Sequence, residues 1–337
     1  MDGQFVVLGI ESTAHTFGVG IVEGSKDDFR ILSDSRSKYV PPKNKGIEPF
    51  EAAESHSKHA IDTLNRALGE AGLNLRDIDI LSFSRGPGLG PCLRIGATLA
   101  RFLALKYNKP LYPVHHGVGH LELVSSYYKL SNPLHLLVSG GHTTILRLKN
   151  GRYRVFGETL DITLGNLIDV FAREAGLSFP GGPIIEKYAK KGRVYLDLPY
   201  TIMGTNFQFS GMLTNALNLL KSGYSLEDVA FSLQETAFSI VVEGLERALT
   251  SMESRPDSVA VSGGVASNDS LFEKIREMAG YHDIEAYRLP KKLNGDNGVQ
   301  IAIVGLKMAL SNISPPPIEN TKVIQRWRID EVDIEWM

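Results

Sequence analysis

The distribution of apolar positions predicts strands and helices that alternate along the chain. Short continuous apolar runs bounded by glycine and polar residues are typical of buried strands, whereas apolar residues repeated every three or four positions indicate helices that bury one face. In the first part of the chain this pattern predicts strands over 5–10, 17–22, 29–35, 78–83 and 111–114, and helices over 48–70, 93–107 and 116–128.

The same order of elements recurs from residue 134 onward. Here the pattern predicts strands over 134–138, 144–148, 152–156, 257–261 and 285–289, and helices over 165–175, 183–189, 211–220, 226–250, 269–278 and 296–310. Both parts read as three strands, helix, strand, glycine turn, helix, strand and helix. We therefore predict a duplicated α/β fold with halves over 1–130 and 131–312, a helical insertion around 160–250 and a tail or linker over 313–337. Two unrelated α/β domains in a row are the alternative.

Composition and charge narrow the class of protein. A length of 337 residues favours two domains, and a net charge of −2 gives no general electrostatic case for binding nucleic acid. The one cysteine, Cys92, excludes an intrachain disulfide and fits a reducing compartment. The first residues predict a strand rather than a signal peptide, and no apolar run approaches the ~18 residues of a membrane helix. We expect a cytoplasmic protein that does not enter the membrane.

Glycine-rich turns follow four of the predicted strands, at 9–13, 85–90, 139–143 and 262–268. In α/β sheets ligands bind beyond the carboxyl ends of parallel strands, and backbone amides in glycine turns bind anions. None of the turns matches the Walker or dinucleotide patterns. A single turn of this kind is ordinarily a hairpin or a helix cap, but four at duplicated positions predict a nucleotide site in a cleft between the halves.

Two histidines four residues apart, His116 and His120, open the predicted helix over 116–128. That spacing places both imidazoles on one helix face, as ligands of a single metal ion require, and Asp296 follows the matching strand of the other half. Two imidazoles and one carboxylate suit iron, zinc or another divalent ion. Surface or capping histidines are the alternative, and His115 is expected to cap the helix or orient a ligand. No glutamate lies between the pair, as a zinc peptidase would need.

Acidic residues flank the PGGP sequence of the second half. Asp169 lies in the predicted helix over 165–175, and Glu186 lies in the helix that PGGP opens. A carboxylate in such a place accepts hydrogen bonds from ribose hydroxyls. Solvated positions on a helix face are the alternative for both.

The chain resembles the TsaD-like family of tRNA threonylcarbamoyladenosine transferases from about residue 5 to 312. The resemblance lies in the ordered motifs GIEST, SRGPGLGPCLRIG, HHGVGH, LLVSGGHT, TLDITLGNLIDVFARE, FPGGP, FSGMLT, LQETAF, SGGVASN and GDNG. It implies the duplicated fold of actin, sugar kinases and chaperone ATPases, which is ribonuclease-H-like with a central interdomain cleft. It also implies transfer of a threonylcarbamoyl group from threonylcarbamoyl-AMP to the adenine 3′ of the anticodon in tRNAs that read ANN codons, with release of AMP.

The resemblance assigns roles residue by residue. His116, His120 and Asp296 match the family's metal ligands, which implies one divalent metal, with iron as first choice and zinc or magnesium as alternatives. The contacts to ATP, AMP or threonylcarbamoyl-AMP match Leu137, Val138, Ser139, Gly140, Gly141, Asp169, Gly182, Glu186 and Asn268. Glu11 and Asp169 are the candidates for a catalytic carboxylate. Many archaeal relatives carry tyrosine at the position of Leu137, so here the metal is expected to have three protein ligands plus water or substrate.

The partners that the resemblance implies are tRNA and the other subunits of the KEOPS complex, whose catalytic subunit this family provides in archaea and eukaryotes. They include a small protein kinase that is fused to this domain in some archaea or docks on it. The basic candidates for tRNA contact are Lys43, Lys45, Arg85, Arg94, Lys187, Lys190, Lys191 and Arg193. An ATPase or kinase of the same superfold that serves as a KEOPS scaffold subunit is the alternative function, and a metallopeptidase is a further one.

Overall fold

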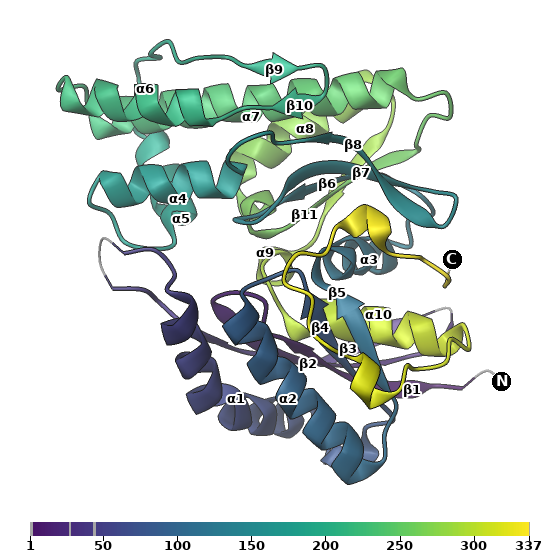
Figure 1. The fold of residues 1–337 in the computed structure, drawn as a ribbon. Coiled ribbons are helices and arrows are strands. Elements are labelled where there is room, and N and C mark those ends of the chain that lie inside the picture. The colour runs from purple at the N-terminus through teal and green to yellow at the C-terminus, as the bar shows by residue number, and fades with distance from the viewer. Residues whose placement is uncertain (1–2, 27, 43–44, 337) are drawn as a thin grey trace.

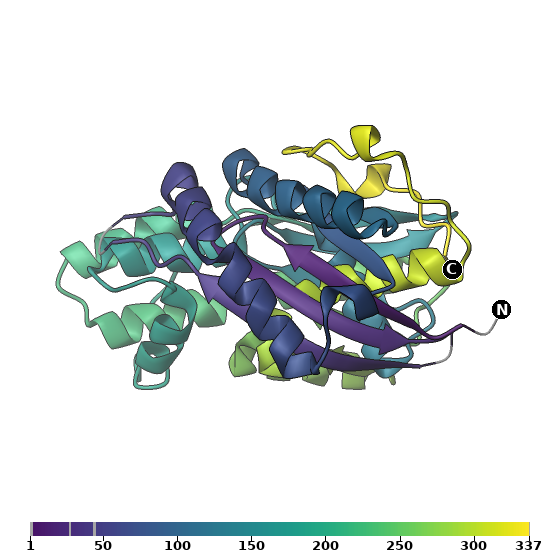
Figure 2. The same cartoon turned by 90° about the horizontal axis from the view of Figure 1, so that it is seen from below.

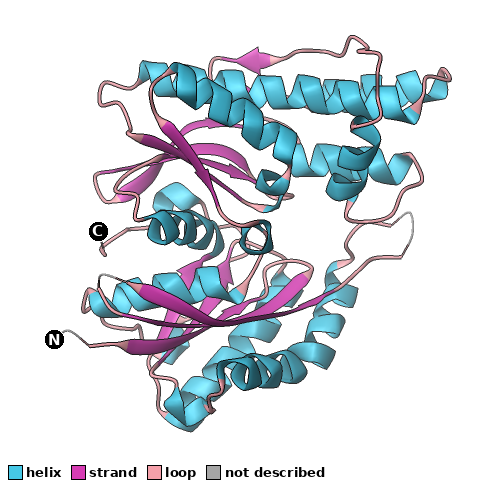
Figure 3. Cartoon of the chain, turned by 180° about the vertical axis from the view of Figure 1, so that it is seen from behind, coloured by secondary structure: helices cyan, strands magenta, loops and turns pink. Residues whose placement is uncertain are grey.

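The computed structural model describes residues 3–26, 28–42 and 45–336, which form two α/β lobes. Each lobe contains one five-stranded sheet, and two helices lie between the sheets (Figures 1 and 3). The remaining long helices cover the outer face of each sheet (Figure 1). The molecule is therefore a stack of alternating helical and sheet layers with the contact between lobes at its centre.

The first part of the chain builds the lower lobe of Figure 1, and its predicted elements are confirmed. They are β1 (Phe5–Glu11), β2 (Thr16–Gly24), β3 (Phe29–Lys38), α1 (Pro49–Ala71), β4 (Ile80–Gly86), α2 (Gly90–Tyr107), β5 (Leu111–His115) and α3 (His116–Tyr128). α2 starts earlier than predicted because Pro91 fits the first turn of a helix, where its missing N–H has no intrahelical partner to lose.

The second part builds the upper lobe and adds elements that the pattern did not predict. Its elements are β6 (Leu134–Val138), β7 (Thr143–Lys149), β8 (Arg152–Glu158), α4 (Leu164–Glu174), α5 (Gly181–Ala189), β9 (Ile202–Met203), β10 (Asn206–Phe207), α6 (Ser210–Lys221), α7 (Leu226–Ser251), β11 (Ser258–Ser262), α8 (Asp269–Tyr281), β12 (Glu285–Arg288), α9 (Lys291–Asn294) and α10 (Gly298–Leu310). The short β9, β10 and α9 were not predicted. Across the described part of the chain, every helix is too short or too polar to span a membrane.

Both sheets have the same strand order, which confirms the predicted duplication. The first sheet runs β3-β2-β1-β4-β5, and the second runs β8-β7-β6-β11-β12. In each half the first three strands along the chain pair antiparallel with one another. The fourth strand (β4 or β11) pairs in parallel with the first (β1 or β6), and the fifth (β5 or β12) pairs in parallel with the fourth. The carboxyl ends of the parallel strands, where the glycine turns lie, therefore meet at one edge of each sheet.

The two central helices each cover the sheet of the opposite half. α10 packs against β1, β2 and β4 of the first sheet, although it is the last helix of the second half. α3 packs against β11 and β6 of the second sheet, and the two helices also pack on each other. α1 and α2 occupy the other face of the first sheet (Figure 2). The final helix of each half of the sequence therefore packs on the sheet of the other half.

Facing glycines let α10 approach the first sheet at backbone distance. A Cβ atom on Gly298 would lie 2.0 Å from the backbone nitrogen of Gly20, and one on Gly20 would lie 2.2 Å from the nitrogen of Val299. A Cβ on Gly9 would lie 2.3 Å from the carbonyl oxygen of Gly298. Only glycine fits such a contact. The high glycine content therefore fixes the first turn of α10, and Asp296 lies directly before that turn.

Residues 313–336 pack along both lobes. On the first lobe, Ile324 N donates to the carbonyl of Arg85 at 2.9 Å and His115 Nε2 bonds the carbonyl of Trp327 at 3.1 Å. On the second lobe, Ile334 N donates to the carbonyl of Gly151 at 2.8 Å. The tail (yellow in Figure 1) therefore connects the two lobes on one side of the molecule.

Buried neutral histidines predict that acid destabilises the fold. His135 on β6 is 1 % exposed and lies against the Tyr153 ring, and burial, reinforced by the charge of Lys307, lowers its pKa to about 3. Because the unfolded chain takes up a proton near pH 6.5 and the native chain does not, stability is full above pH 6.5 and falls as the pH drops towards 3. The expected loss is about 1.4 kcal/mol per pH unit for each such histidine.

The His135→Leu variant isolates this effect. Its free energy of unfolding, measured by denaturant titration, is expected to fall less steeply between pH 6.5 and 5 than that of the wild type, by about 1.4 kcal/mol per pH unit. The two proteins should show the same pH dependence between pH 7 and 8. Equal slopes below pH 6.5 would mean that His135 is protonated in the native state.

Candidate metal centre

Three ligand-type atoms converge where α3 and α10 begin. His116 and His120 lie on one face of α3, and Asp296 lies in the loop between α9 and α10. Asp296 Oδ1 is 3.6 Å from His116 Nε2 and 3.4 Å from His120 Nε2. The ligand atoms of the three residues lie within 4.8 Å of one another, the one group of this kind among the residues that the structure describes. The predicted histidine pair and carboxylate are therefore together in space.

The donor set fits one divalent ion. Ligand atoms that are each about 2.1 Å from a tetrahedral ion are about 3.4 Å apart, which is close to the two separations of Asp296 Oδ1 from the imidazoles. His120 is 1 % exposed, and neither of its ring nitrogens has a hydrogen-bond partner among the described residues. A buried imidazole without partners is costly, and an ion at Nε2 would satisfy it. Two imidazoles and one carboxylate leave positions for water or substrate.

Glu11 orients the first of the two imidazoles. It ends β1 with no exposed surface, and its Oε2 lies 2.9 Å from His116 Nδ1. Its other oxygen accepts the backbone N–H of Thr13 at 2.6 Å. A proton held on Nδ1 by this carboxylate leaves Nε2 of His116 free to face Asp296. Glu11, predicted as a catalytic candidate, therefore lies behind a ligand and not at the open side of the site.

Charge at the centre is balanced between acids and imidazoles. Burial alone would lower the pKa of His116, but the carboxylates of Glu11 and Asp296 raise it to about 9. Burial lowers the pKa of His120, which lies further from Glu11. Burial alone would raise the pKa of the Asp296 carboxyl, but the facing His120 and His116 hold it well below its usual range. The low pKa of Asp296 keeps this ligand carboxylate ionised, which favours a bound cation.

The helix that presents the ligands is capped as the sequence predicted. His115 Nδ1 accepts the backbone N–H of Val118 at 3.2 Å, which satisfies one free donor of the first turn of α3. The other ring nitrogen of His115 bonds the tail at Trp327, so the ring is held from both sides. His115 therefore fixes the start of α3 and does not face Asp296.

Two further histidines surround the centre, and the sequence analysis did not assign them. The ring of His142 stacks on that of His116 with centroids 6.4 Å apart, and burial lowers its pKa to about 4. The ring of His15 meets Phe179 edge-on at 5.3 Å, which joins the two lobes beside Asp296. His15 follows the predicted glycine turn over 9–13 and His142 lies within the one over 139–143, but only the fold brings them to the metal ligands.

The turn after β6 forms the rim of the cleft next to the metal ligands. Ser139 Oγ accepts the backbone N–H groups of Gly141 and His142, and Ser139 N donates to the carbonyl of His142 at 2.7 Å. Leu137 and Val138 are fully buried in hydrophobic clusters, so their side chains are part of the core. The exposed part of this segment is the turn at Gly140 and Gly141, and its contact with a nucleotide stays a prediction.

α4 and α5 begin beside this turn. A Cβ on Gly165 would lie 2.5 Å from the carbonyl oxygen of Ser139, so the first turn of α4 touches the rim. Asp169 Oδ1 accepts the backbone N–H of Gly181 at 2.8 Å, and burial raises its pKa despite this bond. Glu186, one turn into α5, forms an ion pair with Lys190 at 3.0 Å. Asp169 therefore has a structural partner, while Gly182 has open space around it.

Asn268 has its side chain engaged within the fold. Its Oδ1 accepts the backbone N–H of Leu271 at 3.3 Å, which caps α8, and its Nδ2 donates to Gln234 Oε1 at 2.8 Å. It is 7 % exposed. The capping role is confirmed, and contact with a nucleotide stays a prediction.

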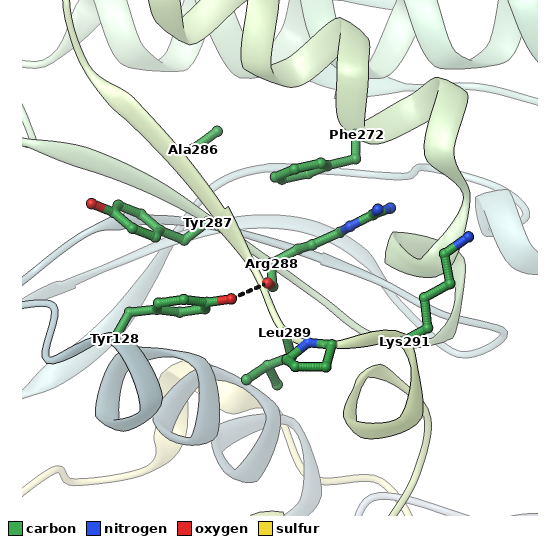
Figure 4. Close-up of a pocket in the computed structure, with 8 residues that line it drawn as sticks. Tyr128, Phe272, Ala286, Tyr287, Arg288, Leu289 and Lys291 are labelled. Carbon is green, nitrogen blue, oxygen red and sulfur yellow. Dashed lines mark hydrogen bonds between the residues drawn. The ribbon is translucent and has the colours of Figure 1, made fainter.

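A groove of about 490 Å³ at the outer edge of β12 lies apart from this centre (Figure 4). The Tyr128 hydroxyl donates to the carbonyl of Arg288 at 2.7 Å, and the Arg288 guanidinium lies over the Phe272 ring. Both cations of the groove, Arg288 and Lys291, are paired with Asp269. Because both cations are paired with Asp269, the described residues of the groove leave no unpaired charge that could take part in the chemistry of the metal centre.

Sequence comparison connects this centre to an enzyme family. The chain matches the family model TsaD, tRNA N6-adenosine threonylcarbamoyltransferase, over residues 30–303. It is 49 % identical to the tRNA N6-adenosine threonylcarbamoyltransferase of Thermofilum pendens, over 98 % of this chain and 96 % of that one. It is 46 % identical to the enzyme of the same name from Caldivirga maquilingensis, over 98 % of both chains.

A longer relative and two solved structures complete the comparison. A probable bifunctional tRNA threonylcarbamoyladenosine biosynthesis protein of Methanothermobacter thermautotrophicus is 47 % identical over 98 % of this chain and 60 % of its own length. T. kodakarensis HypF superposes with a TM-score of 0.60 at 16 % identity, over 91 % of this chain and 48 % of that one. Component A of the Acidaminococcus fermentans (R)-2-hydroxyglutaryl-CoA dehydratase gives a TM-score of 0.57 at 15 % identity, over 90 % and 99 %. The two structures support the duplicated actin-like fold.

Proposed function

The chain belongs to the TsaD family of tRNA N6-adenosine threonylcarbamoyltransferases, and from this premise we propose how its central cleft performs the transfer. His116, His120 and Asp296 hold one divalent ion, and threonylcarbamoyl-AMP binds beside it against the turn Ser139–Gly141 and the start of α5. The enzyme transfers the threonylcarbamoyl group to N6 of an adenosine in tRNA. Iron is the first choice of metal, with zinc and magnesium as alternatives.

One observation carries the proposed arrangement. The two nitrogens of the buried His120 lack partners among the described residues, and its Nε2 faces Asp296 Oδ1 at 3.4 Å. The glycine turn at Ser139 and the first turn of α5 approach the same place from the second lobe, through His142 and Phe179. An ion site thus lies next to backbone amides and helix starts, where a phosphate is well bound.

The transfer needs positioning and charge stabilisation more than a protein nucleophile. A bond forms between adenine N6 and the carbamoyl carbon, the bond from that carbon to the phosphate oxygen breaks, AMP leaves with that oxygen and its electron pair, and the proton from N6 is released to water. When bound, the ion supplies Lewis-acid polarisation of an acyl or phosphate oxygen and a template for the reactants. The backbone N–H of Gly140 and the positive N-terminal end of the α5 dipole stabilise the AMP phosphate as negative charge develops.

The cysteine does not serve as a nucleophile. Cys92 is fully buried on α2, and burial raises the pKa of its thiol to about 11. A nucleophilic cysteine needs an accessible thiolate near a base or a cation. We infer direct attack by the adenine amine on the bound acyl group.

The alternatives that the sequence left open have less support. Comparison with known proteins favours the tRNA transferase over an ATPase, a kinase or a metallopeptidase. We propose tRNA and the other KEOPS subunits, with their protein kinase, as partners. The longer bifunctional relative supports a second activity encoded beside a domain of this kind. We also infer that the enzyme works in the cytoplasm, where tRNA is modified.

The Glu11→Gln variant tests the arrangement at the metal ligands. We expect a 10–100-fold lower transfer rate with threonylcarbamoyl-AMP, unmodified tRNA and the partner subunits, because the neutral amide holds His116 less firmly in the required tautomer. Liquid chromatography of the tRNA nucleosides measures the product. The matched control is Glu23→Gln, a carboxylate on β2 that pairs with the exposed Arg30. Equal rates for Glu11→Gln and Glu23→Gln would exclude a positioning role for Glu11.

A further inference from the structure

α5 leads from the proposed nucleotide site to a group of exposed cations. Its first residue, Gly181, is bound by Asp169, and the preceding Phe179 contacts His15 across the cleft. A Cβ on Gly46 would lie 3.7 Å from Arg173 Nη1, so the loop after β3 meets α4 on the same side (Figure 1). α5 therefore begins next to the contact between the lobes at His15, and its last turn carries exposed side chains.

The end of α5 carries positive charge that the fold does not neutralise. Lys187, Lys190, Lys191 and Arg193 are all exposed. Lys190 pairs with Glu186 on the helix, whereas the side chains of the other three form no ion pair with any described carboxylate. The nearby Asp228 accepts the backbone N–H groups of Arg193 and Val194 instead. Three cations thus remain available to a ligand in a chain whose net charge is −2.

Exposed aromatic rings lie next to these cations. Lys191 Nζ lies over the ring of Tyr188 at 5.8 Å, and Tyr195 and Tyr200 are 51 % and 48 % exposed. Their hydroxyls are bound to Thr236 and Glu243, so the rings are held in place and present their faces or edges to solvent. Cations next to rigid aromatic rings are typical of surfaces that bind single-stranded nucleic acid.

We propose that Lys187, Lys191 and Arg193 bind phosphates of the tRNA strand that flanks the acceptor adenosine. At about 1.5 Å per residue, Lys187 lies about 9 Å along α5 from Gly181, and Lys191 lies just past the end of the helix at Ala189. A stacked strand rises about 3.4 Å per nucleotide, so Lys187 lies roughly three nucleotides from the reacting base. The inference rests on the proposed function, because it takes the start of α5 as the place of the transfer.

The other basic candidates fit this role less well. The Arg85 guanidinium donates to the carbonyls of Asn320 and Lys322 and lies over the Trp327 ring, so it holds the tail. Lys43 lies outside the described residues. Lys45 and Arg94 are exposed singly, whereas Lys187, Lys191 and Arg193 lie close together in sequence, on the last turn of α5 and in the segment directly after it.

The test is the salt dependence of tRNA binding by the full chain loaded with its metal. The variant Lys187→Gln/Lys191→Gln/Arg193→Gln is compared with Lys221→Gln/Arg255→Gln/Lys292→Gln, which removes three exposed charges elsewhere. The first variant is expected to bind unmodified tRNA at least about tenfold more weakly, with a slope of log affinity against log salt that is smaller by about 2. Its KM for threonylcarbamoyl-AMP and its metal content should equal those of the wild type.

The outcomes separate this inference from the proposed function. If the first variant binds tRNA as the second does, with the same salt slope, the inference is wrong even where the wild type is fully active. If the variant raises KM for threonylcarbamoyl-AMP and leaves tRNA binding unchanged, the cations serve the nucleotide and the inference is again wrong. Direct tRNA binding needs no turnover, so it tests the surface even if the wild type forms no product.

Discussion

The His120→Ala variant is expected to lose its bound divalent ion and at least about 10³-fold in transfer rate, while its fold is retained. Removal of this imidazole leaves His116 and Asp296 as ligands, which is fewer than the three protein groups of a catalytic site. A factor of 10³ corresponds to about 4 kcal/mol of lost transition-state stabilisation, which is within the range for a Lewis-acid ion. Neither ring nitrogen has a partner in the described structure, so the change breaks no hydrogen bond of the fold.

Metal analysis by mass spectrometry and the nucleoside assay measure the two losses on the same preparation. The matched control is His282→Ala, because His282 bonds Glu246 on the outer helices, away from the centre. That variant is expected to keep one ion per chain and full transfer activity. If His120→Ala retained its ion, the ligand assignment would be wrong; if it lost the ion but kept the activity, the metal would have no part in the reaction.

The Gly298→Ala variant is expected to destabilise the fold by about 3 kcal/mol and to weaken metal binding as well. The added Cβ would lie 2.0 Å from the backbone nitrogen of Gly20 and 2.6 Å from the carbonyl oxygen of Gly9. Backbone atoms cannot relieve such a clash by a change of rotamer, as a side chain could. α10 must therefore move away from the first sheet. Asp296 lies two residues before Gly298, so this movement shifts a ligand relative to His116 and His120.

Denaturant unfolding and metal titration measure these two effects. Gly69→Ala is the matched control, because Gly69 lies in α1 and a Cβ there would meet nothing within 4 Å. That change is expected to be neutral or to stabilise by up to about 1 kcal/mol, since alanine favours a helix. A Gly298→Ala protein as stable as the wild type would show that α10 and the first sheet have room that the structure does not display.

The sequence predicted the duplicated order of elements because buried strands and amphipathic helices have distinct periodicities. It did not predict that α10 covers the first sheet and α3 the second. An apolar helix face indicates that the helix is buried, but it does not indicate which sheet the helix packs against. The contact that places α10 on the first sheet, between Gly298 and Gly20, joins residues almost 280 positions apart in the sequence. The short β9 and β10 were missed because two-residue strands have no periodicity.

Some residues of the candidate site could likewise be predicted from the sequence, and others could not. His116 and His120 could be paired from their spacing on one helix, and Asp296 could be added from its place after the matching strand of the other half; the family resemblance implies the same three ligands. The bond between Glu11 and His116 could not be predicted from the sequence, because it joins the end of a strand to the start of a helix that only the tertiary fold brings together. For the same reason His15 and His142 went unassigned, and Asp169 was linked to the nucleotide without its bond to the Gly181 N–H being foreseen.

The central claim, that His116, His120 and Asp296 hold one divalent ion beside the nucleotide cleft, is tested most directly by anomalous X-ray diffraction. Crystals of the purified protein would be measured above and below the absorption edge of iron and then of zinc. We predict a single anomalous peak within bonding distance, about 2.1 Å, of His116 Nε2, His120 Nε2 and an oxygen of Asp296. A metal-loaded protein that shows no peak between these three atoms, or shows its peak elsewhere, would contradict the account.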